Sequence, residues 1–246
     1  MLNFRLQQNN VRPSGRQPML NRAHPFFHQQ HIVFAGVAQG KGVLDLVTNV
    51  WSGGSATLSG SDANGPYVYT TDTSGSGLGA CSFAGISTNP LEFVTFGCIL
   101  WLAPGAGRGY PLALITPNTA IWIVGQAIEF VQSGGNAGSF TGIAGHTYLF
   151  VVRNAVGTAS QQRYLYLLDL NTGIVQFTSS TSSGNFTLGP VVALSNTTTF
   201  QSLSRFYCGF ATGSVLVPPA VQPAATFYSI DQFMAGLADP WGLWYA

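Results

Sequence analysis

Charged side chains are scarce in this sequence of 246 residues. They make up 7% of the chain, against roughly 25% in an average soluble domain. Glutamate occurs twice and lysine once, which excludes long solvated helices, because the outer faces of such helices carry these residues. The net charge of +1 and the mean hydropathy of +0.25 exclude a disordered chain, which needs low hydrophobicity and high net charge.

Long apolar runs are also missing. No stretch approaches the roughly 18 to 20 apolar residues of a membrane-spanning helix, so we expect no membrane partner. So few charges of either sign give little repulsion between copies of the chain. We therefore expect the protein to work within an assembly, as a homo-oligomer or with other proteins.

Cysteine is rare and unpatterned. Cys81, Cys98 and Cys208 are odd in number and lack the spacing of a metal site, and the last two lie in the apolar runs FGCIL and FYCGF. A free cysteine packs as a small hydrophobic side chain. We predict three buried free thiols, with a disulfide between two of them as the alternative.

Groups that could catalyse a reaction are few. Glu92 and Glu129 each lie alone in a strand-like run, whereas glycosidases need two facing carboxylates. His146 and Asp169 could meet in three dimensions, but the sequence has no G-x-S-x-G motif, and we interpret His146 as a turn residue. We predict a protein that is not an enzyme, with no catalytic residue and no cofactor.

Two groups of residues carry metal-ligating atoms. Three histidines form an H-x3-H-x2-H pattern that would share one face of a helix, yet the proline after the first one disfavours a helix there. Acidic and amide side chains in a polar stretch could bind calcium or form turns, and turns explain them equally well. We predict no metal site. The groups are His24, His28 and His31, and Asp62, Asn64 and Asp72.

Short apolar runs bounded by turn residues dominate the rest of the chain. They are rich in β-branched and aromatic residues, and the sequence holds 30 glycines and 13 prolines. We predict an all-β fold, an antiparallel two-sheet β-sandwich, with a polar loop at Gly54–Gly65. The strands expected are Leu91–Leu102, Tyr110–Ile115, Ala120–Val124, Ala127–Gln132, Thr147–Arg153, Arg163–Leu170, Ile174–Phe177 and Arg205–Phe210.

The two ends of the chain differ from this pattern. Residues 1–25 show no steady period of 2 or 3.6, which indicates an extended N-terminal arm. The sandwich domain is expected over 26–246. It includes a short helix at 230–238, because Ser229 can cap the helix and Asp231 lies in its first turn, while Pro240 ends it.

The arm is basic. Its four arginines, Arg5, Arg12, Arg16 and Arg22, all precede the first acidic residue, Asp45. Such side chains could contact nucleic acid, but four charges in 22 residues are few, and arginine also binds carboxylates of proteins well. We predict that these four residues dock the arm on a protein partner, and that nucleic acid is not a partner.

Five tryptophans could offer flat faces to a sugar. Trp101 and Trp122 lie in expected strands, so we assign them to the core. Trp51, in the run NVWSGG, and Trp244, near the end, are the better candidates for exposure. These two are the predicted glycan-binding residues, although a structural role also fits them.

Three segments resemble, in this order, the laminin-G-like, concanavalin-A-like jelly rolls of many tailed-phage and prophage virion proteins. They are residues 12–49, with a basic lead and a Gly-rich turn, residues 145–175, with a central hairpin, and residues 228–246, with a short helix before Asp239-Pro240-Trp241. The hairpin lacks the usual Asn-Gly, and the first strand lacks the usual tryptophan and acidic residue. No ligand residue is therefore carried over.

The resemblance implies a non-enzymatic structural protein of a virion, either a capsid decoration or a tail or fibre component. The arm would then order on neighbouring subunits, such as the major capsid protein or tail proteins, where many copies restore affinity through avidity. The alternative is a carbohydrate-binding module for host-surface glycans, which would use Trp51 or Trp244.

Overall fold

The computed structural model describes most of the chain. The described residues are 2–5, 12–13, 16–28, 31–53, 57–70, 81–83, 91–105, 108–114, 119–132, 135–155, 161–182, 191–195, 204–215 and 230–245. Asp72 and Ser229 lie outside these ranges, so the predictions made for them remain predictions.

The described strands form two antiparallel sheets. The large sheet has the order β1 (Leu2–Arg5), β15 (Ile174–Ser182), β14 (Gln161–Asp169), β13 (Thr147–Ala155), β8 (Leu91–Trp101), β17 (Arg205–Val215), β2 (His31–Gln39), β3 (Gly42–Asp45) and β4 (Val50–Gly53), and the hairpin of β5 (Thr57–Asp62) and β6 (Gly65–Thr70) joins it at β17. The small sheet has the order β12 (Gly135–Thr141), β11 (Ala127–Gln132), β10 (Thr119–Val124), β9 (Arg108–Leu114), β16 (Val191–Ser195) and β7 (Cys81–Phe83).

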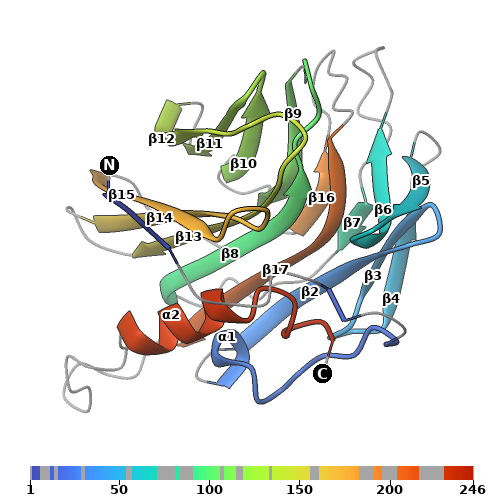
Figure 1. Cartoon of the computed structure of the whole chain (residues 1–246). Helices are drawn as coiled ribbons and strands as arrows, with labels where there is room; N and C mark the ends of the chain where they lie inside the picture. The colour runs from blue at the N-terminus through green and yellow to red at the C-terminus, as the bar shows by residue number, and fades with distance from the viewer. Residues whose placement is uncertain are drawn as a thin grey trace.

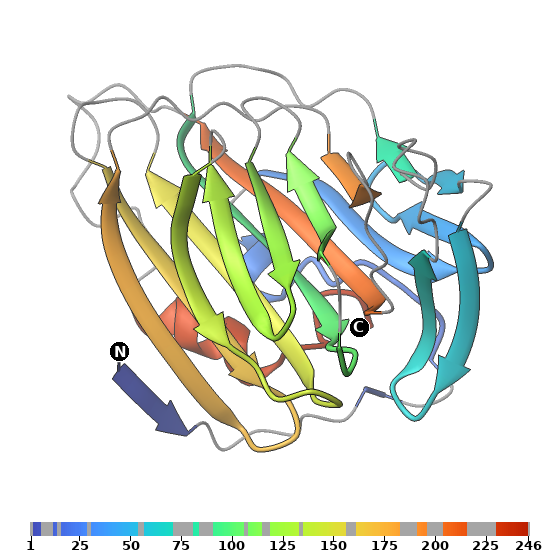
Figure 2. The same ribbon diagram turned by 90° about the horizontal axis from the view of Figure 1, so that it is seen from above.

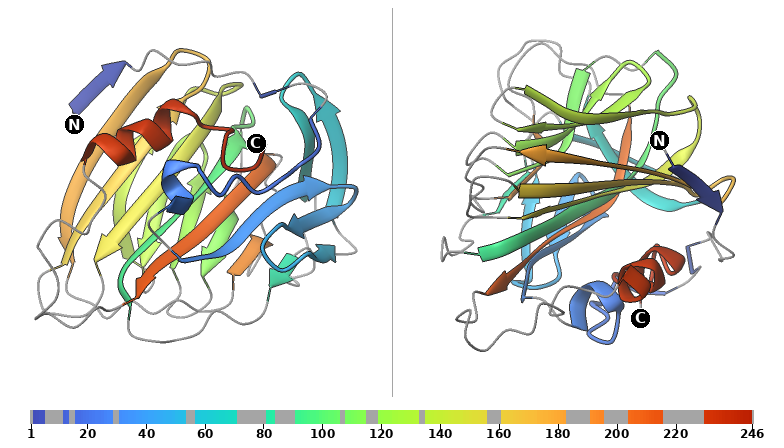
Figure 3. Two further views of the ribbon diagram at one scale, coloured as in Figure 1. Left: turned by 90° about the horizontal axis from the view of Figure 1, so that it is seen from below. Right: turned by 90° about the vertical axis from the view of Figure 1, so that its left-hand side faces the viewer.

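The sheets and helices are stacked in three layers. Figure 1 and Figure 2 show the small sheet lying over one face of the large sheet. Two short helices, α1 (Pro25–His28) and α2 (Ile230–Ala238), lie on the other face of the large sheet, where α2 crosses β13, β14 and β15 (Figure 3). Neither helix is long and apolar enough to cross a membrane, as the described part of the chain shows.

This layering explains why the central strands are apolar on both faces. In β8, Cys98 and Leu100 belong to the core between the sheets, while Ile99 belongs to the core under the helices. In β13, Phe150 and Leu149 are divided in the same way. Successive side chains of a strand point to opposite faces, so a strand covered on both sides can be continuously apolar.

The arm helps to cover the outer face of the large sheet. The amide of Met19 donates to the Trp244 carbonyl (2.8 Å), and the amide of Asn21 donates to the Leu243 carbonyl (2.9 Å). The described residues of the arm therefore lie on their own chain, with a turn at residues 21–24 just before α1. Docking of the arm on a neighbouring subunit stays a prediction, because nothing in the structure bears on a second chain.

The structure confirms the predicted fold class. All eight expected strands are present as β8, β9, β10, β11, β13, β14, β15 and β17, and α2 has the expected bounds. All three cysteines are free and buried, as predicted, and burial raises the pKa of the Cys98 thiol well above its usual range. The expected loop at Gly54–Gly65 is wrong for Thr57–Asp62, which form strand β5 opposite β6.

Phe26, in α1 directly after the arm, provides a test of how firmly this part of the chain packs on the large sheet. Its ring is 2% exposed and stacks on Phe210, with the ring centroids 5.1 Å apart. Phe26→Ala should lower the free energy of unfolding by about 3–5 kcal/mol, because it leaves a cavity in the core under the helices, here called the outer core. Urea denaturation measures the change. Met19→Ala, at a side chain that is 56% exposed, is the control and should change stability by about 0.5 kcal/mol or less. Equal stability of both variants would contradict the packing described.

Candidate functional site

One end of the large sheet carries a hollow lined by aromatic side chains, here called the aromatic hollow. It has a volume of about 340 Å³ and is lined by Tyr67, Tyr69, Trp101, Ala103, Pro104 and Arg205. Three of these six residues are aromatic and one is charged. The hollow therefore combines apolar ring surface with a cation.

Strand pairing brings these residues together from three distant parts of the sequence. Trp101 ends β8 and Arg205 begins β17, and the two residues are direct partners in the ladder. Phe206 pairs with Val68 of β6. Because alternate residues of a strand share a face, Tyr67 and Tyr69 lie on the same face of β6, with their ring centroids 5.9 Å apart.

Arg205 is held in place by aromatic rings and a carboxylate. Its guanidinium carbon lies 4.1 Å from the centre of the Trp101 ring and 4.6 Å from that of Tyr67, within the range of a cation–π contact. Arg205 Nη1 donates to Asp62 Oδ2, and the Tyr207 hydroxyl donates to the same oxygen (2.7 Å). Burial raises the pKa of Tyr207, so this hydroxyl stays protonated and remains a donor.

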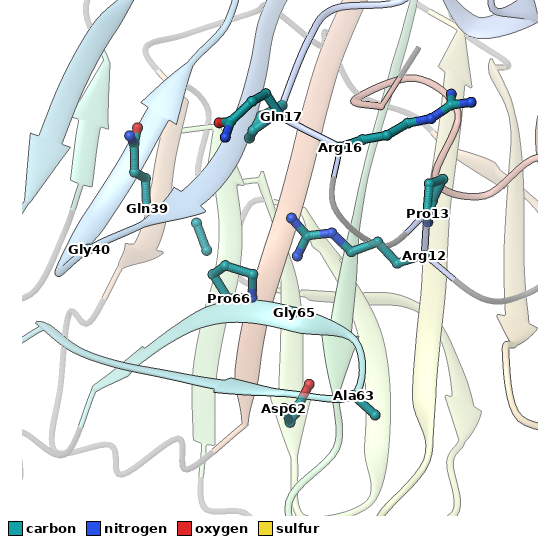
Figure 4. Close-up of a pocket in the computed structure, with 12 residues that line it drawn as sticks. Arg12, Pro13, Arg16, Gln17, Gln39, Gly40, Asp62, Ala63, Gly65 and Pro66 are labelled. Atoms are coloured by element: carbon teal, nitrogen blue, oxygen red, sulfur yellow. The ribbon is translucent and has the colours of Figure 1, made fainter.

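The second hollow, here called the arm cleft, lies on the other side of Asp62. It has a volume of about 460 Å³ and lies between residues 12–13 and 16–18 of the arm, residues 38–40 at the end of β2, and Asp62, Ala63, Gly65 and Pro66 of the β5–β6 hairpin. Figure 4 shows the Arg12 guanidinium reaching across the middle of the cleft toward Gly65 and Pro66. Arg16 also belongs to the lining, and its guanidinium points away from that of Arg12 in the same view.

The structure separates the two predicted glycan-binding tryptophans. Trp51 is 53% exposed on β4, as expected, and its indole N–H donates to the Gln39 carbonyl (3.3 Å). Trp244 is 1% exposed, so the expectation of exposure is wrong for it. Its indole N–H donates to the Gly209 carbonyl (3.3 Å), and its ring meets Phe210 edge-on, which makes it part of the outer core.

Trp101 departs from its predicted place in the core. It is partly buried and packs against both cores, yet one side of it lines the aromatic hollow. Trp122 is also only partly buried. No sequence motif singled out Tyr67, Tyr69 or Arg205. The alternation of the run YVY is the one local signal that places both tyrosines on a common face.

The four arginines of the arm are not gathered in one place. Arg12 and Arg16 both line the arm cleft. Arg22 is exposed and is not among the residues of that lining. Arg5 lies in β1, opposite Ile174 of β15, and its side chain is outside the described residues. The predicted docking role of all four stays a prediction.

His146 and Asp169, which were weighed for catalysis, lie at the β14–β15 turn. His146 Nδ1 lies 2.8 Å from Asp169 Oδ2, so these two side chains do meet. The other carboxylate oxygen of Asp169 accepts the amides of Asn171 (2.8 Å) and Thr172 (3.3 Å) and thereby closes the β14–β15 turn. The hydroxyl next to the pair belongs to Thr147 and accepts from the Asn64 amide (3.0 Å). This network supports the turn rather than a nucleophile.

The two glutamates lie in different sheets, Glu92 in β8 and Glu129 in β11. The side chain of Glu92 lies outside the description. Glu129 pairs with Trp122 on one side and Ser139 on the other. Neither of these two described partners is acidic, so the strand pairing does not place a second carboxylate beside Glu129.

Asp62 and His24, which were weighed as metal ligands, have other partners, whereas the side chains of His28 and His31 lie outside the described residues. Asp62 Oδ1 accepts the Asn64 amide (2.8 Å), which confirms the turn interpretation for this residue. His24 Nδ1 accepts the Phe26 amide (3.1 Å), and its Nε2 lies 3.0 Å from the Asp239 carbonyl. The first contact makes Nδ1 an acceptor, so the proton sits on Nε2 and is donated to Asp239. Within the described residues, no group of three side chains could hold a metal ion.

Comparison with known proteins identifies the fold. No protein-family model matches the sequence, and no curated protein matches it. The binding domain of Paraclostridial Mosquitocidal Protein 1 superposes with a TM-score of 0.51 at 7% identity, covering 85% of this chain and 52% of that one. This match and the arrangement of the sheets give an antiparallel β-sandwich.

Two further solved structures superpose less closely. The binding domain of Botulinum Neurotoxin DC in complex with SialylT has a TM-score of 0.44 at 10% identity, with 85% of this chain and 51% of that one covered. Arcelin-5, a lectin-like defence protein from Phaseolus vulgaris, has a TM-score of 0.37 at 8% identity, with 87% and 99% covered. The chain thus spans about half the length of the toxin domains that it matches. The virion assignment stays a prediction, because this likeness concerns the fold.

His24 should make stability fall in mild acid. Burial lowers its pKa below the usual 6.5, although the Asp239 carbonyl and the charge of Asp239 act in the opposite direction. The unfolded chain therefore takes up a proton near pH 6.5 while the folded chain does not, and the free energy of unfolding decreases as the pH falls below about 6.5. Urea denaturation between pH 7 and pH 5 measures this slope.

His24→Asn should flatten that slope, because asparagine can still accept the Phe26 amide at the start of α1 but has no charged form in this range. Met19→Ala, at an exposed side chain that does not titrate, is the control and should keep the slope of the unchanged protein. An identical slope in all three proteins would contradict the role given to His24.

Proposed function

We propose that the protein is a glycan-binding module and that the aromatic hollow holds the sugar. The observation that carries this proposal is the guanidinium of Arg205, fixed between the rings of Trp101 and Tyr67 in an open hollow. A sugar presents apolar C–H faces and a rim of hydroxyl groups. Aromatic side chains with a polar handle suit the first, and fixed donors suit the second.

The hydrogen bonds of Arg205 leave donors for a ligand. A guanidinium has five N–H groups, and the contact with Asp62 occupies Nη1. The Arg205 side chain is 29% exposed and lines the hollow, so part of its fork of donors is open to a ligand. Since Asp62 compensates its charge, the hollow as a whole favours neutral hydroxyl acceptors over a free anion.

The fold agrees with this proposal without supplying it. The chain shares its sandwich with the binding domain of a toxin, but a fold by itself does not determine a function. The described part of the arm packs on its own chain. A virion location, and docking on capsid or tail proteins, remain predictions from the sequence resemblance.

Tyr69 is the residue of choice for a test, because it lines the hollow without touching Arg205 in any contact described above. The wild-type protein is first applied to a glycan array, and the best saccharide is then titrated by calorimetry. Tyr69→Ala should weaken binding about tenfold, which corresponds to about 1.4 kcal/mol. The reason is the loss of one of the three aromatic surfaces of the hollow.

Two variants show where the sugar lies. Ile174→Ala changes a side chain that is 40% exposed on β15 and should leave binding unchanged. Trp51→Ala tests the site predicted from the sequence. Binding that is lost in Trp51→Ala and kept in Tyr69→Ala would move the site to β4, and an array without any bound glycan would refute the function itself.

A further inference from the structure

The arm cleft has a positive charge that the residues around it do not neutralise. Arg12 and Arg16 both line it, and Asp62 is the one acidic residue among its described lining. Both oxygens of Asp62 are occupied elsewhere. Oδ2 accepts from Arg205 and Tyr207, and Oδ1 accepts the Asn64 amide. The charge of Asp62 is thus balanced by Arg205, outside the cleft.

Arg12 is held in position before any ligand arrives. Its guanidinium carbon lies 4.1 Å above the centre of the Tyr245 ring, and its Nη1 donates to the Asn64 carbonyl (3.1 Å). A stacked guanidinium with one anchored nitrogen has a fixed plane, and its other N–H groups keep the fork that matches two oxygens of a carboxylate. Little side-chain entropy remains to be lost on binding.

Gly65 makes this position available to Arg12. Its φ of +96° lies in a region that other residues rarely adopt. A Cβ atom at this position would lie 1.9 Å from Arg12 Nη1, well inside contact distance. The hairpin therefore carries a glycine where the guanidinium passes, and any larger residue would push the guanidinium out of the cleft.

The other walls supply neutral hydrogen-bonding groups. Figure 4 shows Gln17 and Gln39 on the side of the cleft opposite Asp62. The guanidinium of Arg12 lies between the two glutamines on one side and the hairpin with Asp62 on the other. An amide side chain has two donors and an acceptor, so it can bind hydroxyl groups. The cleft volume of about 460 Å³ lies within the range of about 300–1,000 Å³ that is usual for small-molecule sites.

We propose that the arm cleft is a second binding site, which takes the carboxylate of an acidic sugar on Arg12 and its hydroxyl groups on Gln17 and Gln39. Arg16, the second arginine of the lining, adds to the positive charge of the cleft. The sugar part of this assignment rests on the proposed glycan binding. The anion part does not, because it follows from the unbalanced arginines alone.

Glucuronate, glucose and inorganic phosphate are the probes, each titrated into the full-length protein by calorimetry. Glucuronate should bind at least about fivefold more tightly than glucose, and Arg12→Gln should weaken it about tenfold. Arg22→Gln removes the same charge from an exposed position outside the cleft lining and should leave the affinity within about twofold. Higher salt should weaken the binding of glucuronate and not that of glucose.

Two further variants separate a local effect from a loss of fold. Gly65→Ala keeps every charge and should weaken glucuronate binding as much as Arg12→Gln does, by displacing the guanidinium. Tyr69→Ala changes the aromatic hollow and should leave glucuronate binding unchanged. A urea denaturation curve is recorded for each variant to test whether it is folded. Arg16→Gln, which also removes a charge from the lining, replaces Arg12→Gln or Gly65→Ala if either one does not fold.

The outcomes distinguish this inference from the proposed function. Glucuronate that binds no better than glucose, or that binds Arg12→Gln and the unchanged protein equally, would overturn the inference. Phosphate that binds as tightly as glucuronate would overturn the sugar assignment and leave a general anion site. Glucuronate binding that is weakened by Arg12→Gln, together with glycan binding that Tyr69→Ala leaves unchanged, would support the arm cleft as a site and contradict the aromatic hollow.

Discussion

The structure depends on burying both faces of the large sheet. Its central strands carry apolar side chains on each side, and the small sheet covers only one of them. The second face is closed by α1, α2 and the segments next to them, including the buried Trp241 and Trp244. Hydrophobic burial is roughly proportional to the apolar area removed from water. The arm residues that pack there, such as Leu20, and the described C-terminal segment therefore contribute to the stability of the sheet.

Three of the acidic residues accept hydrogen bonds from backbone amides. Asp45 accepts the amides of Ala35, Val47 and Thr48 at the β3–β4 turn. Asp169 closes the β14–β15 turn in the same manner, and Asp62 holds its own hairpin and Arg205. Because these carboxylates are engaged, the arginines of the arm cleft remain uncompensated. The scarcity of charge noted in the sequence thus concentrates positive potential at one place.

Strands and cysteines could be predicted because their signals are local. Runs of β-branched and aromatic residues mark β8, β13 and β14. The helix α2 ends before Pro240, as the sequence predicts. The site could not be predicted in this way. Trp101 and Arg205 are neighbours only through the register of β8 and β17, and their side chains give no sign of that register. Trp244 was misplaced because its position near the end of the sequence suggested exposure, whereas tertiary packing buries it.

The β5–β6 hairpin stands between the two hollows. Asp62, Gly65 and Pro66 form part of one wall of the arm cleft, while Tyr67 and Tyr69 line the aromatic hollow. The pairing of Val68 with Phe206 joins the hairpin to β17. A ligand that steadies the hairpin from one side lowers the cost of ordering it from the other. The two occupancies would then be thermodynamically linked, each raising the affinity of the other by the same factor.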